Sequence, residues 1–284
     1  MNDDRTHRAV SVDGTEIAGR VYGHGPPLVL VHGGLGDDLS WGPLVPYLTE
    51  YFSCYTMSTR GRGLSVEPSE PDYSLDRLVQ DVVAFVESIG EPVGLVGYSL
   101  GGALALGATA HSAAISALAV YEPAVFEAHS DADPSRVDDM AARLGEAVAE
   151  ERLVDAALAM VEAVLTDAER VALAGSGVFE AWSSNVLVAL QEAEQASTSQ
   201  APSPTDPSLL ACIKVPVLYL RGTSTPTGWY VDGARQVAEH VHDVRSVEIT
   251  GAGHFAPILH PRPIADELVR FFTESTAVAD ELRP

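Results

Sequence analysis

A serine in a glycine-rich turn is the strongest chemical signal in the chain. Residues Gly97-Tyr98-Ser99-Leu100-Gly101 fit the pattern Gly-x-Ser-x-Gly, between an apolar run at Val93 to Val96 and an Ala- and Leu-rich stretch that begins at Leu100. A turn this tight requires neighbours without a Cβ atom, and it lifts the serine hydroxyl above the edge of a sheet at a helix N-terminus. We therefore expect Ser99 to act as a nucleophile.

A serine hydroxyl needs a base before it can attack a carbonyl. The segment Gly251-Ala252-Gly253-His254-Phe255 places a histidine in a glycine-flanked loop directly after the last predicted strand. An imidazole in that loop can lie over the serine, so His254 is the predicted base. We interpret His32, in an early glycine-rich segment, as a hydrogen-bonding residue that stabilises its own loop.

That early segment, Val31 to Gly36, follows the first apolar run of the chain. Its glycine-rich backbone can present an N–H group to the oxyanion that develops when a carbonyl is attacked. Gly34 is the predicted donor, and Leu35 is the next candidate. The second donor is expected to be the N–H of Leu100, directly after the nucleophile.

The elements that must position these residues alternate between strands and helices. Apolar or alternating runs predict strands at 15–22, 28–31, 52–57, 93–96, 115–121, 215–220 and 244–249. Helical periodicity predicts helices at 41–49, 76–89, 100–111, 230–241 and 263–272. This alternation is typical of the α/β class, with a mostly parallel central sheet covered by helices on both faces.

One long segment interrupts the alternation. Residues Pro123 to Pro207 contain no strand-like run and are rich in Ala, Glu, Asp, Val and Leu at helical spacing. Because the segment lies between two predicted strands, we interpret it as a helical cap over the carboxyl edge of the sheet. The predicted organisation is a core of residues 1–122 and 208–284 with an inserted cap at 123–207.

Taken together, the order of these motifs resembles the α/β-hydrolase superfamily. The resemblance runs from Thr15 to Phe272 and includes a turn at Thr59 to Ser65 similar to the family's D-x-R-G-x-G-x-S, with Ser58 in place of the aspartate. The resemblance implies a serine hydrolase that needs no cofactor and no metal. An aspartate-nucleophile dehalogenase or epoxide hydrolase is disfavoured, because the nucleophile position holds Ser99.

The chain departs from the family at the acid that orients the histidine. Relatives usually carry an aspartate after the strand that precedes the histidine, and Thr225 stands there. Glu122, at the end of the strand after the nucleophile helix, lies at the same sheet edge as Ser99. A minority of α/β hydrolases, including fungal-mycotoxin lactone hydrolases, place the acid there, so Glu122 is the predicted acid. Asp232 and the absence of a working acid remain alternatives.

The predicted reaction is hydrolysis of a carboxylic ester or lactone through an acyl-enzyme, with amide and carbon–carbon hydrolysis left open. Two other classes remain. One is a non-hydrolytic enzyme such as an acyltransferase, cyclase or haloperoxidase-like perhydrolase, and the other is a ligand-binding or receptor module that kept the fold but has a degenerate triad and no hydrolysis. The expected pocket residues are Leu35, Tyr98, Trp182, Trp229 and Phe255.

Charge and composition restrict the partners. The 284 residues carry a formal net charge of −23, which disfavours binding to nucleic acid or to anionic membranes. Twelve acidic residues face only four arginines between Glu127 and Arg170, so a neutral, apolar small-molecule substrate is favoured. Two cysteines form no disulfide framework or metal motif. We expect a cytoplasmic protein, monomeric or homodimeric.

Overall fold

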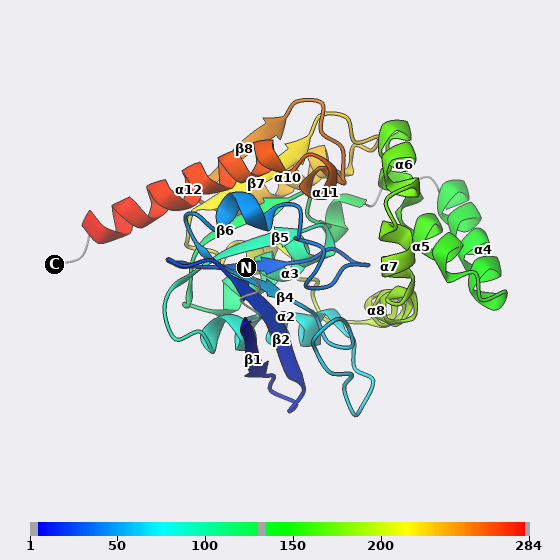
Figure 1. The fold of residues 1–284 in the computed structure, drawn as a ribbon, viewed down its shortest axis with the longest axis horizontal. Coiled ribbons are helices and arrows are strands. Elements are labelled where there is room, and N and C mark those ends of the chain that lie inside the picture. Colours follow the sequence, from blue (N-terminus) through cyan, green and yellow to red (C-terminus); the bar gives the residue numbers. More distant parts are fainter. Residues whose placement is uncertain (1–4, 130–133, 282–284) are drawn as a thin grey trace.

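The computed structural model describes residues 5–129 and 134–281. An eight-stranded sheet lies at the centre, in the order β1-β2-β4-β3-β5-β6-β7-β8, with helices on both faces (Figure 1). The strands are β1 (Arg5–Val10), β2 (Glu16–Tyr22), β3 (Pro27–Val31), β4 (Ser53–Met57), β5 (Val93–Tyr98), β6 (Ile115–Tyr121), β7 (Val217–Gly222) and β8 (Val244–Ile249). β1 and β2 are antiparallel to each other, and β2 is antiparallel to β4.

The remaining strands, from β4 through β8 in the order of the sheet, pair in parallel. Parallel strands are buried on both faces, which is why β3 is a continuous apolar run with every residue buried. The carboxyl ends of parallel strands meet at one edge. Tyr98 and Tyr121 are register partners at that edge. The residues that follow them, Ser99 and Glu122, therefore leave the sheet side by side.

Helices of the core cover the two faces of the sheet. The core helices are α1 (Val45–Leu48), α2 (Leu75–Glu87), α3 (Leu100–His111), α9 (Pro207–Leu210), α10 (Trp229–His240), α11 (Ala256–Leu259) and α12 (Pro261–Glu281). Apolar side chains of α2, α3, α9 and α10 share one buried cluster, and those of α1, α11 and α12 share another. The sheet is therefore the middle of three layers.

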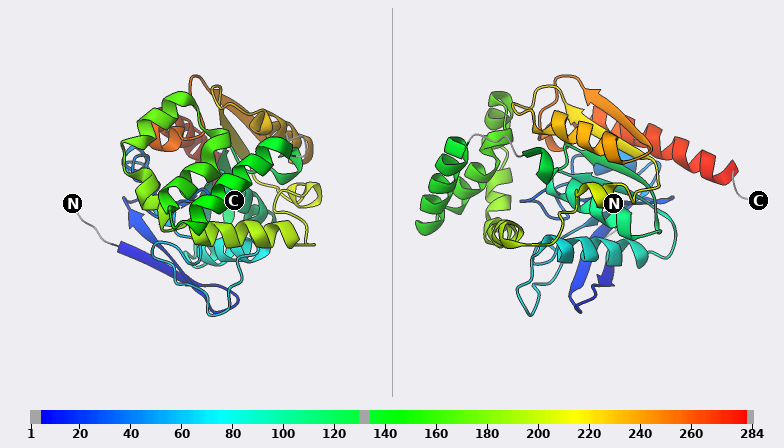
Figure 2. Two further views of the ribbon diagram at one scale, coloured as in Figure 1. Left: turned by 90° about the vertical axis from the view of Figure 1, so that its right-hand side faces the viewer. Right: turned by 180° about the vertical axis from the view of Figure 1, so that it is seen from behind.

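The segment between β6 and β7 forms a separate helical group. It contains η1 (Phe126–His129), α4 (Pro134–Ala149), α5 (Leu153–Val161), η2 (Glu162–Val164), α6 (Asp167–Ala174), α7 (Val178–Ser183) and α8 (Val186–Thr198). Helices α4 to α8 stand together at one end of the molecule in both Figure 1 and Figure 2. Their buried side chains form a third apolar cluster that includes Leu35 and Phe255 of the core. We call this group the cap.

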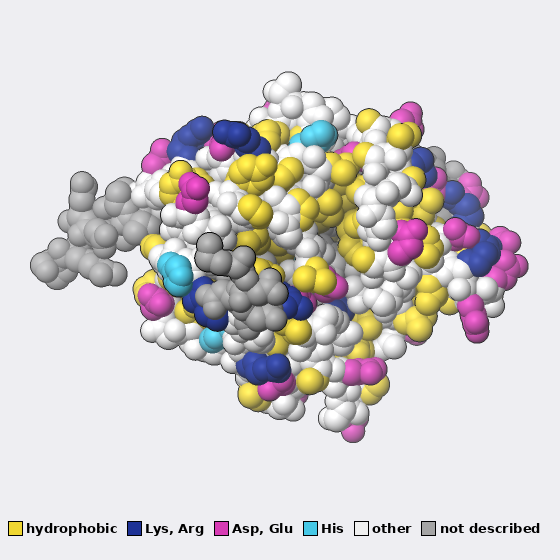
Figure 3. Space-filling model, viewed as in Figure 1, with side chains coloured by type: hydrophobic (Ala, Val, Ile, Leu, Met, Phe, Trp, Pro, Cys, Tyr) yellow, Lys and Arg dark blue, Asp and Glu magenta, His cyan; other side chains and the backbone are white. Residues whose placement is uncertain are grey.

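The acidic character of the cap is visible on its surface, where carboxylates and arginines are interspersed (Figure 3). Glu146 and Glu150 are exposed, as expected for a solvated face. Glu169 and Glu192 are exceptions, since both side chains are buried. Within the described residues, no helix is both long and apolar enough to cross a membrane.

The predicted fold class, a mostly parallel α/β sheet with an inserted helical cap, is confirmed. The helix expected at 41–49 is reduced to α1 (Val45–Leu48), preceded by turns. β1 was not predicted, because it is an edge strand with few apolar residues, in which exposed side chains alternate with half-buried ones and the buried Ala9. α12 continues past the predicted end at residue 272 to Glu281.

Candidate active site

Ser99 lies on a strained turn between β5 and α3. Its φ angle is 54° and its ψ angle is −121°, a conformation that L residues seldom adopt. A Cβ atom on Gly97 would lie 2.4 Å from the carbonyl oxygen of Gly101, and one on Gly101 would lie 2.2 Å from that of His32. The N–H of Ala124 donates to the carbonyl of Ser99 at 2.9 Å and helps hold the turn. Both glycines of the motif are therefore required by close backbone approach.

His254 and Glu122 form a buried hydrogen bond at the same sheet edge. The distance between His254 Nδ1 and Glu122 Oε2 is 2.7 Å, and the two residues are 3% and 0% exposed. Glu122 itself has a positive φ of 42°, directly after β6. Because Nδ1 is engaged by the carboxylate, Nε2 is the ring nitrogen left to exchange a proton with a substrate or nucleophile.

Aromatic residues fix the plane of the His254 ring. Tyr230, on α10, stacks on it with 5.0 Å between ring centroids and 11° between planes. Tyr98 and Phe255 contact it at centroid distances of 5.0 and 5.3 Å. The hydroxyl of Tyr121 donates to the carbonyl of Gly253 at 2.6 Å and anchors the loop. Burial raises the pKa of Tyr98 and of Tyr230 well above the ordinary value, so both hydroxyls stay neutral.

The second oxygen of Glu122 is held by the β7 loop. Oε1 accepts a hydrogen bond from the N–H of Gly222 and another from the Thr225 hydroxyl, both at 2.8 Å. Thr225, which stands where the family resemblance places an aspartate, thus supports the carboxylate of Glu122 directly after β6. Asp232, the alternative acid, lies on α10, where its side chain is 47% exposed and pairs with Arg235 at 3.1 Å.

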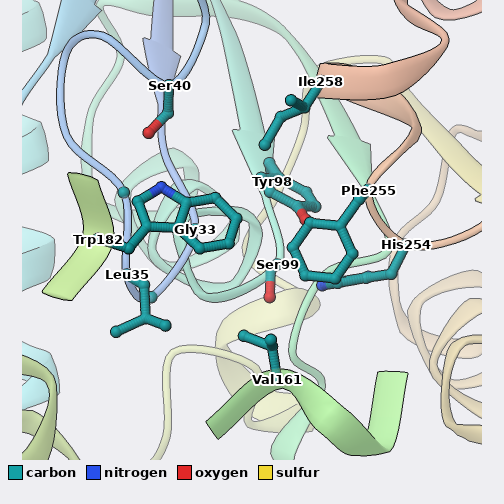
Figure 4. A pocket seen from close by; sticks show the side chains of 12 residues that line it. Gly33, Leu35, Ser40, Tyr98, Ser99, Val161, Trp182, His254, Phe255 and Ile258 are labelled. Carbon is teal, nitrogen blue, oxygen red and sulfur yellow. The ribbon is translucent and has the colours of Figure 1, made fainter. Parts of the chain in front are cut away.

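Ser99 and His254 line a common cavity between the sheet edge and the cap, and Figure 4 shows both side chains pointing into it. The other lining residues are Gly33, Gly34, Leu35, Gly36, Ser40, Tyr98, Val161, Trp182, Phe255 and Ile258. Four of the five expected pocket residues line it. Trp229 does not, because it begins α10, and the next residue of that helix, Tyr230, faces His254 instead.

The glycine-rich loop after β3 packs against the turn that carries Ser99. A Cβ atom on Gly33 would lie 3.3 Å from the Cβ atom of Ser99. The carbonyl of Gly33 accepts hydrogen bonds from His32 Nδ1 at 2.8 Å and from the N–H of Gly36 at 2.9 Å. The N–H of Gly34 belongs to the same peptide unit and points the opposite way. The N–H of Leu100, at the first position of α3, has no partner within its helix.

His32 is a structural residue of this loop. Nδ1 donates to Gly33, so Nε2 is the acceptor for the N–H of Thr59 at 3.1 Å. Burial, followed by the charge of Arg62, lowers the pKa of His32 to about 3. The ring is therefore neutral at physiological pH, which suits hydrogen bonding within the loop rather than proton transfer.

Three polar side chains of the cap also reach the active-site loops, and sequence reasoning missed them. Glu169, on α6, accepts a hydrogen bond from the N–H of Phe255 at 2.7 Å. Asn185 donates to the carbonyl of Leu35, the residue after Gly34. Glu192 accepts a hydrogen bond from Arg62, which lies beside the same loop. Between Asn185 and Leu35 the chain separation is 150 residues, so no local pattern could have indicated these contacts.

The unusual Ser58 also has a structural explanation. Its hydroxyl donates to Asp38 Oδ1 at 2.7 Å, and the N–H of Asp38 donates back to the hydroxyl oxygen at 3.1 Å. Asp38 comes from the loop after β3, and Arg20 Nε lies 2.6 Å from its other oxygen. The carboxylate usually found at this turn is thus supplied from another segment. Across the described residues, no group of three His, Cys, Asp or Glu side chains is arranged to hold a metal ion.

Comparisons with known proteins agree with this architecture. A 2-hydroxy-6-oxo-6-(2'-aminophenyl)hexa-2,4-dienoic acid hydrolase from Metapseudomonas resinovorans is 26% identical over 94% of this chain and 90% of its own. An N-formylmaleamate deformylase from Pseudomonas putida is 33% identical, but the match covers 42% of this chain and only 45% of that protein.

Among solved structures, an alpha/beta hydrolase from Sphaerobacter thermophilus superposes with a TM-score of 0.72 at 28% identity, over 94% of this chain and 100% of that one. The model of the Alpha/beta hydrolase family matches residues 28–267, which span the Ser99 turn, the cap and the His254 loop. The chain therefore belongs to the alpha/beta hydrolase family of enzymes.

Proposed function

We propose that this protein is a serine hydrolase that cleaves a carboxylic ester or lactone of a small, neutral and apolar substrate. One observation carries the proposal. The 2.7 Å bond between His254 Nδ1 and Glu122 Oε2 makes Nε2 the ring nitrogen for proton exchange, and His254 shares its cavity with Ser99 on a strained turn. A nucleophile, a base and an acid that orients the base are the components of acyl-transfer catalysis.

In the first half of the reaction, Ser99 Oγ forms a bond to the substrate carbonyl carbon while its proton passes to His254 Nε2. Negative charge develops on the carbonyl oxygen, and the N–H groups of Gly34 and Leu100 are the proposed donors to it. The carbon–oxygen bond to the leaving alcohol then breaks, and His254 gives its proton to that oxygen. Glu122 offsets the positive charge that His254 carries in between.

In the second half, water attacks the acyl-enzyme. Its proton passes to His254, the bond to Ser99 Oγ breaks, and the serine recovers a proton as the acid leaves. With a lactone, the alcohol released in the first half remains part of the same molecule, and the product is one hydroxy acid. The two relatives described above are named as a deformylase and a hydrolase, which favours water as the acceptor over a transferase reaction.

The character of the cavity supports the choice of substrate. Apart from the hydroxyls of Ser40 and Tyr98, its lining side chains beside Ser99 and His254 are apolar, and none is an Asp, Glu, Lys or Arg. Such a lining suits a neutral apolar group. The receptor alternative rested on Thr225 in place of an acid, and the bond from Thr225 to Glu122 gives that threonine another role.

A fluorophosphonate probe tests this proposal, because it reacts with an activated serine. We expect one adduct on the peptide that contains Ser99, loss of the adduct in Ser99→Ala, and hydrolysis of p-nitrophenyl acetate by the wild type only. Ser116→Ala is a matched control, since that hydroxyl donates to the carbonyl of Val93 away from the cavity. Absence of labelling at Ser99 in the folded wild type would overturn the proposal.

A further inference from the structure

The loop that carries Gly34 is held by the cap as well as by the core. Asn185, the residue before α8, donates from Nδ2 to the carbonyl of Leu35 at 3.0 Å and to that of Gly36 at 3.3 Å. Arg62, from the turn after β4, donates from Nη1 to the carbonyl of Gly34. Three consecutive carbonyls of the loop therefore accept hydrogen bonds from two side chains.

Arg62 is in turn fixed by the cap. Its Nη2 donates to Glu192 Oε2, on α8, at 2.5 Å. Both residues are almost completely buried, at 2% and 3% exposure. The ion pair thus connects α8 to the carbonyl of Gly34, and Asn185 connects the start of the same helix to the next two carbonyls.

The free energy of folding alone does not explain the buried Arg62–Glu192 pair. Burying two charges costs much of what their attraction supplies, and apolar side chains of similar volume often stabilise a protein as well or better. Arg62 Nε and Glu192 Oε1 are buried without a hydrogen-bond partner among the described residues, which adds to the cost. A positional role explains the pair better.

The loop needs such external support because Gly33 and Gly34 are adjacent glycines, whose backbone angles are permissive. The two peptide units that flank Gly34 must both be held to direct its N–H group. His32 and Gly36 hold the preceding unit through the carbonyl of Gly33. Arg62 holds the following unit through the carbonyl of Gly34.

We propose that α8 completes the oxyanion hole: Asn185 directly, and Glu192 through Arg62, are positioning residues that aim the Gly34 N–H at the substrate when the cap is seated. This inference rests on the serine-hydrolase function proposed above. It makes the cap a component of the catalytic geometry as well as a cover for the cavity.

The disrupting variants are Asn185→Ala and Glu192→Leu. Each is expected to lower kcat for p-nitrophenyl acetate at least tenfold with KM changed less than threefold, because loss of one oxyanion donor affects mainly the transition state. The affinity for a trifluoromethyl ketone, whose serine adduct carries the oxyanion, should fall by the same factor as kcat/KM. Glu192→Gln keeps an acceptor for Arg62, so it should retain kcat within threefold of the wild type.

Gln195→Ala is the matched control, because Gln195 lies on the same helix and also joins the cap to the core. Its side chain accepts from the N–H of Tyr73 at 2.8 Å and donates to the carbonyl of Pro71 at 3.1 Å, both outside the Gly34 loop. It should lower the melting temperature without changing kcat more than twofold. If Asn185 or Glu192 had a purely structural role, its variant would behave like this control.

If Glu192→Leu fails to fold because Arg62 is left unpaired, Arg62→Met combined with Glu192→Leu removes both charges. This double variant should fold and still show the loss of kcat and of ketone affinity. The inference is overturned if Asn185→Ala and the folded Glu192 variant match Gln195→Ala in both measurements. An unlabelled and inactive wild type would instead overturn the proposed function itself.

Discussion

The hydroxyl of Thr225 donates to Glu122 Oε1 at 2.8 Å. Thr225, which stands after β7 where an aspartate was expected, thus binds the carboxylate of Glu122, which follows the neighbouring strand β6. With the N–H of Gly222 on the same oxygen, it leaves Oε2 directed to His254. A carboxylate with both oxygens engaged is fixed in orientation, which is what a residue that orients an imidazole requires.

Thr225→Val is expected to lower kcat/KM for p-nitrophenyl acetate about tenfold. One hydrogen bond to a charged group contributes roughly 1.5–3 kcal/mol, and loss of about half of that energy in the transition state corresponds to a tenfold lower rate. Thr225→Ser, which keeps the hydroxyl, should remain within threefold of wild type. Thr223→Val is a control in the same loop, because the Thr223 hydroxyl accepts from the N–H of Gly251 instead. Equal rates for Thr225→Val and Thr223→Val would contradict this role.

The size of the cavity predicts a preference for short acyl groups. Its volume is about 40 Å³, room for a few water-sized groups, and Trp182 of the cap closes part of it (Figure 4). Trp182→Leu should raise the ratio of kcat/KM for p-nitrophenyl octanoate over acetate at least tenfold. Assays across acetate, butyrate and octanoate give this ratio.

Phe179→Leu is the control for that experiment. Phe179 lies on the same helix, is buried to the same extent and contacts Trp182 edge to face, but it is not one of the residues that line the cavity. Its variant should keep the wild-type chain-length preference. If both variants change the preference equally, cap packing rather than the volume at Trp182 determines it.

Glu192 predicts a specific pH dependence of stability. Burial raises its pKa to about 7 from an ordinary value near 4.5, although Arg62 opposes the shift. Arg62 and the Tyr73 hydroxyl are the ionisable groups that interact with it. The folded state binds the Glu192 proton more tightly than the unfolded state does. The stabilisation that this proton gives is therefore complete below pH 4.5 and is lost as the pH rises through 7.

The wild type should therefore lose about 2–3 kcal/mol of unfolding free energy from this group between pH 5 and pH 8, and Glu192→Gln should not. Urea denaturation of both proteins at pH 5, 6, 7 and 8 gives the difference between their unfolding free energies. The contributions of all other titrating groups cancel in that difference. Parallel pH curves for the two proteins would show that Glu192 does not titrate in this range.

Much of this arrangement was predictable from local sequence, because the responsible patterns are short. The glycines around Ser99, the apolar run of β5 and the Ala-rich start of α3 all point to one turn. β6 and β8 were predicted with their observed ends, since β6 is mostly apolar and β8 carries Val244, Val247 and Ile249 between polar residues. The expected placement of Glu122 followed from strand ends that meet at one edge of a parallel sheet.

What sequence could not predict depends on packing between distant segments. Asn185 and Glu192 contact the Gly34 loop only because α8 folds across the sheet edge. Trp229 was expected in the pocket, but Tyr230 faces His254 instead. Adjacent residues of a helix point about 100° apart, so this choice depends on how α10 is rotated about its axis. Replacement of an aspartate by Ser58 was compensated by Asp38, twenty residues earlier.

In the proposed mechanism, Glu122 orients His254 for the reaction at Ser99. The most direct measurement compares kcat/KM for p-nitrophenyl butyrate in Glu122→Ala and Asp232→Ala, with folding checked by circular dichroism. Loss of a triad carboxylate costs roughly 10⁴ in the best-studied case, so Glu122→Ala should lose a hundredfold or more and Asp232→Ala less than twofold. Near-normal turnover in Glu122→Ala, together with an inactive Asp232→Ala, would contradict the account.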